Sequence, residues 1–203
     1  MSAFIFDVDG TLIDSYDGIT KATISVLDKY NYKMDNVRRY ILDNSVLDLF
    51  KIVSGKTGVE YSLLYDEYKK ERIKTQFDYC FMKNAVSTLY KLKYEENKLF
   101  IFTHKGNAID KILELDKLKE LFDEVISSDS PNFKRKPDPY CINYLVEKYN
   151  LDKNDTYYVG DRRIDMECAK NANIKGIFYG KADDSIGYDI VISDFNELIN
   201  CVK

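Results

Sequence analysis

The sequence is poor in the residues that build zinc sites and histidine-dependent triads. Its 203 residues include one histidine, His104, and four cysteines, namely Cys80, Cys141, Cys168 and Cys201. The cysteines are widely spaced, with no CxxC pair and no cysteine–histidine cluster, which excludes the common zinc patterns. His104 lacks a triad partner in the sequence. We expect the cysteines to be small apolar residues in a reducing compartment, and therefore a cytoplasmic protein.

Long hydrophobic runs and an excess of positive charge are also missing. No apolar run approaches the roughly 18 residues of a membrane-spanning helix. The first apolar stretch is interrupted by Asp7 and Asp9, unlike a signal peptide. With 30 Lys and Arg against 34 Asp and Glu, the net charge of -4 argues against a general nucleic-acid binder. We expect neither a membrane nor a nucleic acid as partner, and a monomer or weak dimer.

The sequence does have a pair of acidic residues directly behind an apolar run. Residues 3–6 are typical of a strand buried on both faces, and Asp7, Asp9 and Gly10 follow them. Ligands of open α/β sheets collect at the carboxyl ends of strands. Two carboxylates there can hold a divalent metal while one attacks or transfers a proton. The competing interpretation is a solvated acidic turn, because Asp and Gly are common turn residues.

The segment from residue 15 to residue 80 shows only helical periodicity. Apolar residues recur at i, i+3, i+4 and i+7, and no strand pattern interrupts them. The expected helices lie at 19–30, 38–42, 46–55 and 61–68. We therefore predict a compact helical insertion after the first strand.

From residue 83 onward, helices and strands alternate. The expected strands are 99–102, 124–127, 156–159, 176–179 and 189–192, and the expected helices are 86–90, 109–113, 140–149, 164–171 and 195–202. This alternation is typical of a parallel sheet with right-handed crossovers. We predict an α/β fold: a Rossmann-like parallel sheet core with helices on both faces, made of 1–14 and 81–203, plus a small all-helical domain at 15–80.

In such a sheet, polar residues behind several strands meet at one edge. The set comprises Asp7, Asp9, Thr103, Asp161 and Asp165, with Lys136 within reach. Carboxylates suit a hard divalent cation such as Mg²⁺, which prefers oxygen ligands. A phosphoryl group would complete the site, because its charge offsets the metal and the lysine.

This pattern resembles the haloacid dehalogenase superfamily of aspartate-nucleophile phosphatases, whose signature begins DxDGT[LV] after the first strand. The matching segments occur in the family's order and cover the whole chain: residues 7–12, Thr103 at a strand end, Lys136 in the Lys-Pro-Asp-Pro segment 136–139, and 160–165. The helical insertion looks like the cap domain of the phosphoglycolate phosphatase and β-phosphoglucomutase branch.

The resemblance implies roles for the acidic residues. Asp7 is expected to be the nucleophile that forms an aspartyl-phosphate intermediate, and Asp9 the general acid and base. Mg²⁺ is expected on the Asp7 carboxylate, the Asp9 main-chain carbonyl and the Asp161 carboxylate. Asp165 is expected to support this site through water or the lysine. Taken alone, Asp165 could instead be a solvated acid in the first turn of a helix.

The resemblance also implies contacts to the phosphate. Thr103 is expected to bind a phosphate oxygen, and Lys136 to offset the repulsion between nucleophile and substrate. Gly10, His104 and Lys105 are expected on the substrate-binding surface, His104 through its backbone N–H and with its imidazole facing the substrate. Taken alone, Thr103 could be a helix-capping hydroxyl and Lys136 part of an exposed basic loop.

Substrate selection is expected from the cap domain, which closes over the site to exclude water and contact the leaving group. We expect Asn44, in the loop 43–46, to belong to this surface, with Arg39, or alternatively Arg38 or Lys56, as an anion contact. A cap of this size leaves room for a small phosphorylated metabolite.

Three functions remain open. The first is a Mg²⁺-dependent phosphatase, and the second a sugar phosphomutase of the β-phosphoglucomutase type, in which the same nucleophile returns its phosphate to a sugar. The third is a receiver-like phospho-acceptor module, but receivers are shorter and lack both a helical insertion after the first strand and the DxDGT segment.

Overall fold

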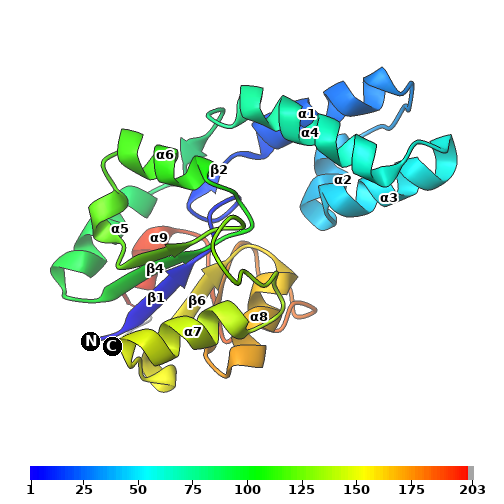
Figure 1. Cartoon of the computed structure of the whole chain (residues 1–203). Helices are drawn as coiled ribbons and strands as arrows, with labels where there is room; N and C mark the ends of the chain where they lie inside the picture. Colours follow the sequence, from blue (N-terminus) through cyan, green and yellow to red (C-terminus); the bar gives the residue numbers. More distant parts are fainter. Residues whose placement is uncertain (201–203) are drawn as a thin grey trace. The chain divides into compact units, whose positions relative to one another are not determined.

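The computed structural model describes residues 1–200 and divides the chain into two compact units (Figure 1). One unit, here called the core unit, comprises Met1–Ile13 and the chain from Phe81 onward. The other, the helical unit, is Asp14–Cys80. Within the described residues no helix combines the length and the apolar character that crossing a membrane requires.

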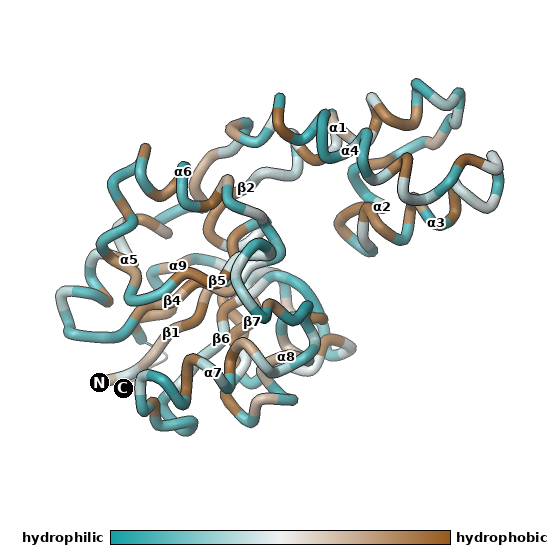
Figure 2. The backbone as a smooth tube through the Cα atoms, in the orientation of Figure 1, coloured by the Kyte–Doolittle hydropathy of each residue, from teal (hydrophilic) through white to brown (hydrophobic). Residues whose placement is uncertain are grey.

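A six-stranded parallel sheet organises the core unit and confirms the predicted fold class. Its order is β5-β4-β1-β6-β7-β8. The strands are β1 (Ala3–Phe6), β4 (Lys98–Phe102), β5 (Glu124–Ile126), β6 (Thr156–Gly160), β7 (Lys175–Tyr179) and β8 (Ile190–Ile192). The central strands β1 and β4 are largely hydrophobic in Figure 2, as expected for strands covered on both faces.

The first strand lies between two strands that come much later in the sequence. Phe6, at the end of β1, is opposite Ile101 of β4 and Val159 of β6. The chain first adds β4 and β5 on one side of β1, and then β6, β7 and β8 on the other. Strand order therefore reverses at β1, and such reversal points are where open α/β sheets bind ligands.

Helices cover both faces of this sheet (Figure 1). On one face lie α5 (Ala85–Tyr94), α6 (Ala108–Leu115) and α9 (Phe195–Leu198), and on the other α7 (Tyr140–Tyr149) and α8 (Arg163–Ala172). Short 3₁₀ helices occur at η1 (Lys119–Leu121) and η2 (Lys153–Asp155). Because side chains alternate along a strand, Phe6 stacks on Phe195 of α9, while Ile5 packs in the cluster that includes Ile142 of α7.

The helical unit contains α1 (Tyr16–Lys29), α2 (Val37–Asp43), α3 (Val46–Thr57) and α4 (Tyr61–Thr75). Val26, Ile41, Phe50 and Leu64, one from each helix, belong to its hydrophobic core. At the junction of the two units, β2 (Ile13–Asp14) and β3 (Cys80–Phe81) form a two-stranded sheet that the sequence analysis did not anticipate. Strands of two residues are too short to show a periodic pattern.

Several helix ends differ from the prediction, and three of them have a clear physical reason or limit. Helix α3 continues through Gly55 to Thr57, and the φ of 73° at the following residue, Gly58, suits a glycine C-cap. Helix α4 extends past residue 68 to Thr75, where ion pairs at i, i+3, such as Glu71 with Lys74, join its polar residues. The closing helix ends at Leu198, short of the predicted 195–202, of which 201 and 202 lie outside the described residues.

Candidate active site

Three neighbouring strands of the core unit end in polar residues. Asp7 directly follows β1, Thr103 follows β4 and Asp161 follows β6. The backbone N–H of Asp7 donates to the carbonyl oxygen of Val159 at 2.9 Å, and that of Thr103 to Ile126 at 2.9 Å. The sheet hydrogen bonds therefore continue one residue beyond β1 and β4 and fix the backbone positions of Asp7 and Thr103.

An acidic cluster occupies this edge of the sheet. One carboxylate oxygen from each of Asp7, Asp161 and Asp165 lies within 4.8 Å of the others. Asp165 comes from the first turn of α8, where its Oδ2 accepts the backbone N–H of Arg162 at 3.1 Å. Asp7 and Asp165 are buried and Asp161 is partly exposed. Three converging carboxylates are a donor set that fits Mg²⁺.

Lys136 connects two members of the acidic cluster. Its Nζ donates to Asp7 Oδ1 at 2.6 Å and to Asp165 Oδ1 at 2.7 Å, and its side chain is 3% exposed. The ammonium lies 5.3 Å from the ring centre of Phe102 and 5.2 Å from that of Tyr158. Burial alone would lower the pKa of Lys136, but the Asp165 and Asp7 carboxylates outweigh it and raise that pKa, so the lysine is charged.

The cluster contains more negative charge than its neighbours neutralise. Burial raises the pKa of Asp7 to about 6, despite the opposing effect of Lys136. Burial and the charges of Asp165 and Asp7 raise the pKa of Asp161 to about 8. Both shifts would be relieved by a cation between the carboxylates, so the electrostatics fit a metal site as well as the donor atoms do.

The turn after β1 supports the cluster through Thr11, a residue to which the sequence analysis gave no role. The Oγ1 of Thr11 donates to Asp161 Oδ1 at 2.9 Å, across 150 positions of sequence. Thr11 belongs to the recognised DxDGT segment, and that position was the available signal. Gly10 has a φ of 90°, and its N–H donates to the carbonyl of Ile13 at 2.8 Å. This N–H is therefore engaged in a hydrogen bond within the turn.

The turn after β4 contains Thr103 and His104. Thr103 Oγ1 accepts the backbone N–H of Lys105 at 3.1 Å, and His104 Nε2 accepts that of Lys136 at 3.0 Å. Arg135 Nη2 lies 3.4 Å from His104 Nδ1. Burial and the charges of Lys136 and Arg135 lower the pKa of His104 to about 2, so its ring is neutral. The imidazole thus holds the backbone that presents Lys136, and this geometry does not favour the predicted substrate contact of the ring.

Asp9 and Lys105 form a second ion pair at the same edge. Lys105 Nζ donates to Asp9 Oδ1 at 2.7 Å. Both residues were predicted for the site, Asp9 for acid–base catalysis and Lys105 for substrate binding, but their mutual contact was not. Nothing in the sequence distinguishes a lysine directed at a substrate from one directed at a neighbouring carboxylate.

The other two predicted substrate contacts lie in the helical unit. Arg39, on α2, donates from Nε to Asp43 Oδ2 at 2.8 Å. Asn44, the C-cap residue of α2, donates from Nδ2 to the carbonyl of Tyr40 at 3.2 Å. Both therefore belong to the end of one short helix.

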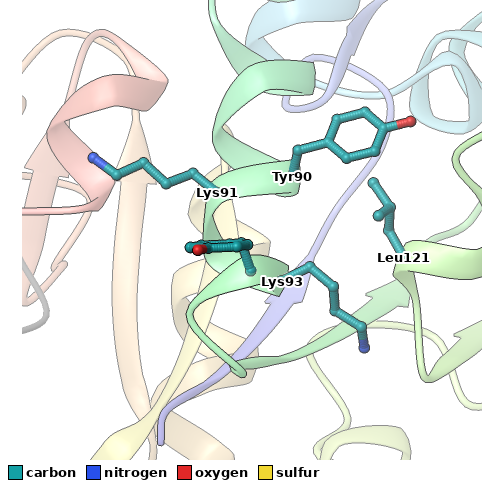
Figure 3. Close-up of a pocket in the computed structure, with 5 residues that line it drawn as sticks. Tyr90, Lys91, Lys93 and Leu121 are labelled. Atoms are coloured by element: carbon teal, nitrogen blue, oxygen red, sulfur yellow. The ribbon is translucent and has the colours of Figure 1, made fainter.

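A hollow of about 530 Å³ on the core unit has a different character (Figure 3). It is lined by Tyr90, Lys91, Lys93 and Tyr94 of α5 and by Leu121 of η1. The lining contains no carboxylate and none of the residues at the strand ends. Its side chains therefore offer neither a nucleophile of the predicted type nor metal ligands.

Comparisons with known proteins agree with this geometry. A sequence profile of the haloacid dehalogenase-like hydrolases matches residues 4–179. A phosphoglycolate phosphatase from Psychrobacter arcticus is 30% identical over 97% of this chain and 93% of its own length. Pyrophosphatase PpaX from Bacillus velezensis is 26% identical over 86% of this chain and 81% of its own length.

A solved structure has the same fold. The haloacid dehalogenase-like hydrolase from Streptococcus pneumoniae superposes with a TM-score of 0.85, covering 100% of this chain and 99% of that chain at 18% identity. The family profile spans the three strand ends, the acidic cluster and Lys136. The chain therefore belongs to the haloacid dehalogenase-like hydrolase family.

Proposed function

We propose that the chain is a Mg²⁺-dependent phosphatase that hydrolyses a small phosphorylated metabolite through an aspartyl-phosphate on Asp7. The observation that carries this proposal is the buried Asp7–Lys136–Asp165 bridge at the carboxyl end of β1. A nucleophilic carboxylate needs a nearby positive charge to approach a phosphate anion, and Lys136 provides it within a water-poor site. The similarity to phosphoglycolate phosphatases supports the same assignment.

The reaction has two steps that share the same residues. In the first, an Asp7 carboxylate oxygen bonds to phosphorus, the ester P–O bond breaks, and Asp9 gives its proton to the leaving oxygen. In the second, a water oxygen bonds to phosphorus, Asp9 takes the proton of the water, and the Asp7–phosphate bond breaks. Inorganic phosphate leaves, and Asp7 and Asp9 regain their starting states.

The acidic cluster supplies the cation site for this chemistry. Asp7, Asp161 and the main-chain carbonyl of Asp9 would hold Mg²⁺, which when bound neutralises charge on the phosphoryl oxygens. Asp165 has one oxygen on Lys136 and the other on the Arg162 N–H, an arrangement that favours a supporting role. Thr11 orients Asp161 through its hydrogen bond. Thr103 is assigned to a phosphate oxygen through its hydroxyl hydrogen, because Oγ1 accepts the Lys105 N–H.

The helical unit is assigned as the cap domain that selects the substrate. Its insertion between Ile13 and Phe81 places it immediately after the residues of the catalytic turn in sequence. Arg39 and Asn44 are its proposed substrate contacts. A second anionic group on the substrate, such as a carboxylate or another phosphate, suits an arginine at this position.

A panel of phosphate esters tests the proposal. Phosphate release would be measured for p-nitrophenyl phosphate, 2-phosphoglycolate, pyrophosphate and several sugar phosphates, with Mg²⁺ and with a chelator. We expect release from at least one of them that is lost with chelator and in Asp7→Asn. Asp110→Asn, at a surface carboxylate on α6 paired with Lys119, should keep full activity. Isomerisation of a sugar phosphate without phosphate release would contradict the phosphatase assignment in favour of a mutase.

A further inference from the structure

The ion pair between Lys105 and Asp9 has an unusual environment. Among the ion pairs of the described residues 1–200, only those of Lys105 and Lys136 involve a lysine side chain less than a tenth exposed. Removing an ammonium group from water is unfavourable unless a partner of opposite charge compensates for it. Lys136 forms ion pairs with two carboxylates, those of Asp7 and Asp165. Lys105 forms its ion pair with the carboxylate of Asp9.

The backbone around Lys105 holds it in one position. Its N–H donates to Thr103 Oγ1 at 3.1 Å, and its carbonyl accepts the N–H of Ser128 at 3.0 Å. Lys105 stands three residues after the end of β4, as Asp9 stands three residues after the end of β1, and the two strands are neighbours in the sheet. Two adjacent turns thus bring the ammonium and the carboxylate together with little freedom in either backbone.

We propose that Lys105 is a positioning residue that holds the carboxylate of Asp9 in the orientation required for proton transfer. This inference rests on the proposed function, because it assigns Lys105 a role in the acid–base step of that reaction. It differs from direct phosphate binding by Lys105, in which the ammonium would contact the substrate. The 2.7 Å contact with Asp9 Oδ1 directs the ammonium to the catalytic carboxylate instead.

The two roles predict different dependence on the leaving group. p-Nitrophenolate is a good leaving group that needs little protonation, whereas an alkoxide leaves only with a proton from Asp9. In Lys105→Met, we expect kcat/KM for an alkyl phosphate to fall about 100-fold and that for p-nitrophenyl phosphate by less than about tenfold. For the alkyl phosphate, the loss should lie in kcat with KM nearly unchanged.

A double-mutant cycle then shows whether Lys105 acts through Asp9. In an Asp9→Ala background, Lys105→Met should reduce kcat/KM for p-nitrophenyl phosphate by less than about twofold, because the carboxylate it positions is already absent. Lys93→Met is the matched control, since Lys93 pairs with Asp123 at 2.9 Å on the same unit. It should behave like the wild type.

Two further variants of Lys105 distinguish a loss of its positioning role from a loss of folding. Lys105→Gln keeps a hydrogen-bond donor without the charge, and Lys105→Arg keeps both, so activity on the alkyl phosphate should increase from Met to Gln to Arg. Thermal unfolding of each variant would be measured alongside. A fold that is intact in Lys105→Arg together with activity no better than that of Lys105→Met contradicts the positioning role.

The remaining outcomes separate this inference from the proposed function. Equal losses on both esters, persisting in the Asp9→Ala background, would mean that Lys105 binds the phosphate itself and would overturn the inference. Asp7-dependent hydrolysis that is insensitive to Lys105→Met would overturn it and leave the phosphatase standing. A wild-type protein that releases phosphate from no member of the panel would overturn both.

Discussion

At the level of single residues, the negative charges of the acidic cluster repel one another. This repulsion makes the free energy of unfolding of the protein depend on pH. Asp161 has a folded-state pKa of about 8, far above its ordinary value of 3.8. Between these values the folded protein binds more protons than the unfolded chain, so raising the pH lowers the free energy of unfolding. His104 acts in the opposite direction, but only below its ordinary value of 6.5, because its folded pKa is about 2.

We therefore expect the free energy of unfolding, measured with chelator present, to decrease from pH 6.5 to pH 8. Chemical denaturation at several pH values measures it. Asp161→Asn should flatten the slope, because it removes the titrating carboxylate. Mg²⁺ should raise the melting temperature more at the upper end of this range, where it competes with fewer protons. A wild-type stability that rises across the range would contradict the electrostatic account.

Thr11 offers a test of how the metal site is supported. Thr11→Val keeps the shape of a fully buried side chain but removes its hydrogen bond to Asp161. We expect the Mg²⁺ concentration for half-maximal activity to rise about tenfold, in the range found for residues that orient metal ligands. Thr23→Val, at a buried threonine that donates to the Ile19 carbonyl in α1, is the control and should leave Mg²⁺ dependence unchanged.

The sequence predicted which side chains lie together at the ends of the strands, but it did not predict the hydrogen bonds and ion pairs between them. Asp7, Thr103 and Asp161 could be brought together because carboxyl ends of parallel strands share one edge. The contacts of Thr11 with Asp161 and of Lys105 with Asp9 depend on how two turns face each other. Turn geometry of that kind is set by tertiary packing and leaves no periodic signal in the sequence.

At the level of elements, the junction between β6 and α8 is tightly packed. A Cβ added to Gly160 would lie 2.4 Å from Asp165 Cβ, well inside normal contact distance. Asp165 is itself held by Lys136 and by the Arg162 N–H, so it cannot move without breaking one of these bonds. The glycine therefore allows the acidic cluster to assemble.

Gly160→Ala should consequently displace Asp165 and disrupt its bond to Lys136. We expect a destabilisation of about 1–3 kcal/mol from overpacking and a loss of activity larger than this destabilisation alone explains. Urea denaturation and phosphate release at saturating Mg²⁺ measure the two effects. Wild-type activity and stability in this variant would show that the junction is less constrained than the geometry indicates.

Gly55→Ala is the matched substitution at an unconstrained position. Gly55 lies inside α3, and nothing is within 4 Å of an added Cβ. Alanine favours a helix interior over glycine by about 1 kcal/mol, so the free energy of unfolding should rise by up to this amount. A destabilised Gly55→Ala would contradict the assignment of residue 55 to a regular helix interior.

Strands and helices of the core were predictable to within a few residues because their apolar patterns are strong. The largest differences occur where a helix continues beyond its apolar pattern or ends before that pattern does. Helix α4 continues through 69–75, a polar stretch whose helical state depends on propensity and on ion pairs such as Lys74 with Glu71. The closing helix α9 ends at Leu198, although the apolar residues continue to Ile199.

At the level of the whole molecule, the proposal divides chemistry and selection between the two units. Arg39→Ala and Asn44→Ala should change the ranking of substrates in the metabolite panel while leaving Mg²⁺ dependence intact. Lys51→Ala, at an exposed lysine of α3 paired with Asp48, is the control and should keep the wild-type ranking. Equal losses on every substrate in Arg39→Ala and Asn44→Ala would argue that these residues do not contact the leaving group.

The order of the sheet shows what sequence alone leaves open at this scale. Alternating strands and helices predicted a parallel sheet, but the position of β1 between β4 and β6 follows only from the observed topology. That position brings Asp7 between Thr103 and Asp161. The proposed selection of the substrate rests on surface side chains of the helical unit, whereas its apolar stripes specify only its own core.

The most direct test of the central claim is whether Asp7 becomes phosphorylated. Asp9→Ala should slow hydrolysis of the intermediate while still accepting phosphate from p-nitrophenyl phosphate, because that leaving group needs little protonation. Acid quenching during turnover, followed by mass spectrometry, should find one phosphoryl group on the peptide that contains Asp7, and none in Asp7→Asn with Asp9→Ala. Turnover of p-nitrophenyl phosphate by Asp7→Asn at the wild-type rate, with no phosphoryl group on Asp7 in the Asp9→Ala protein, would contradict the account.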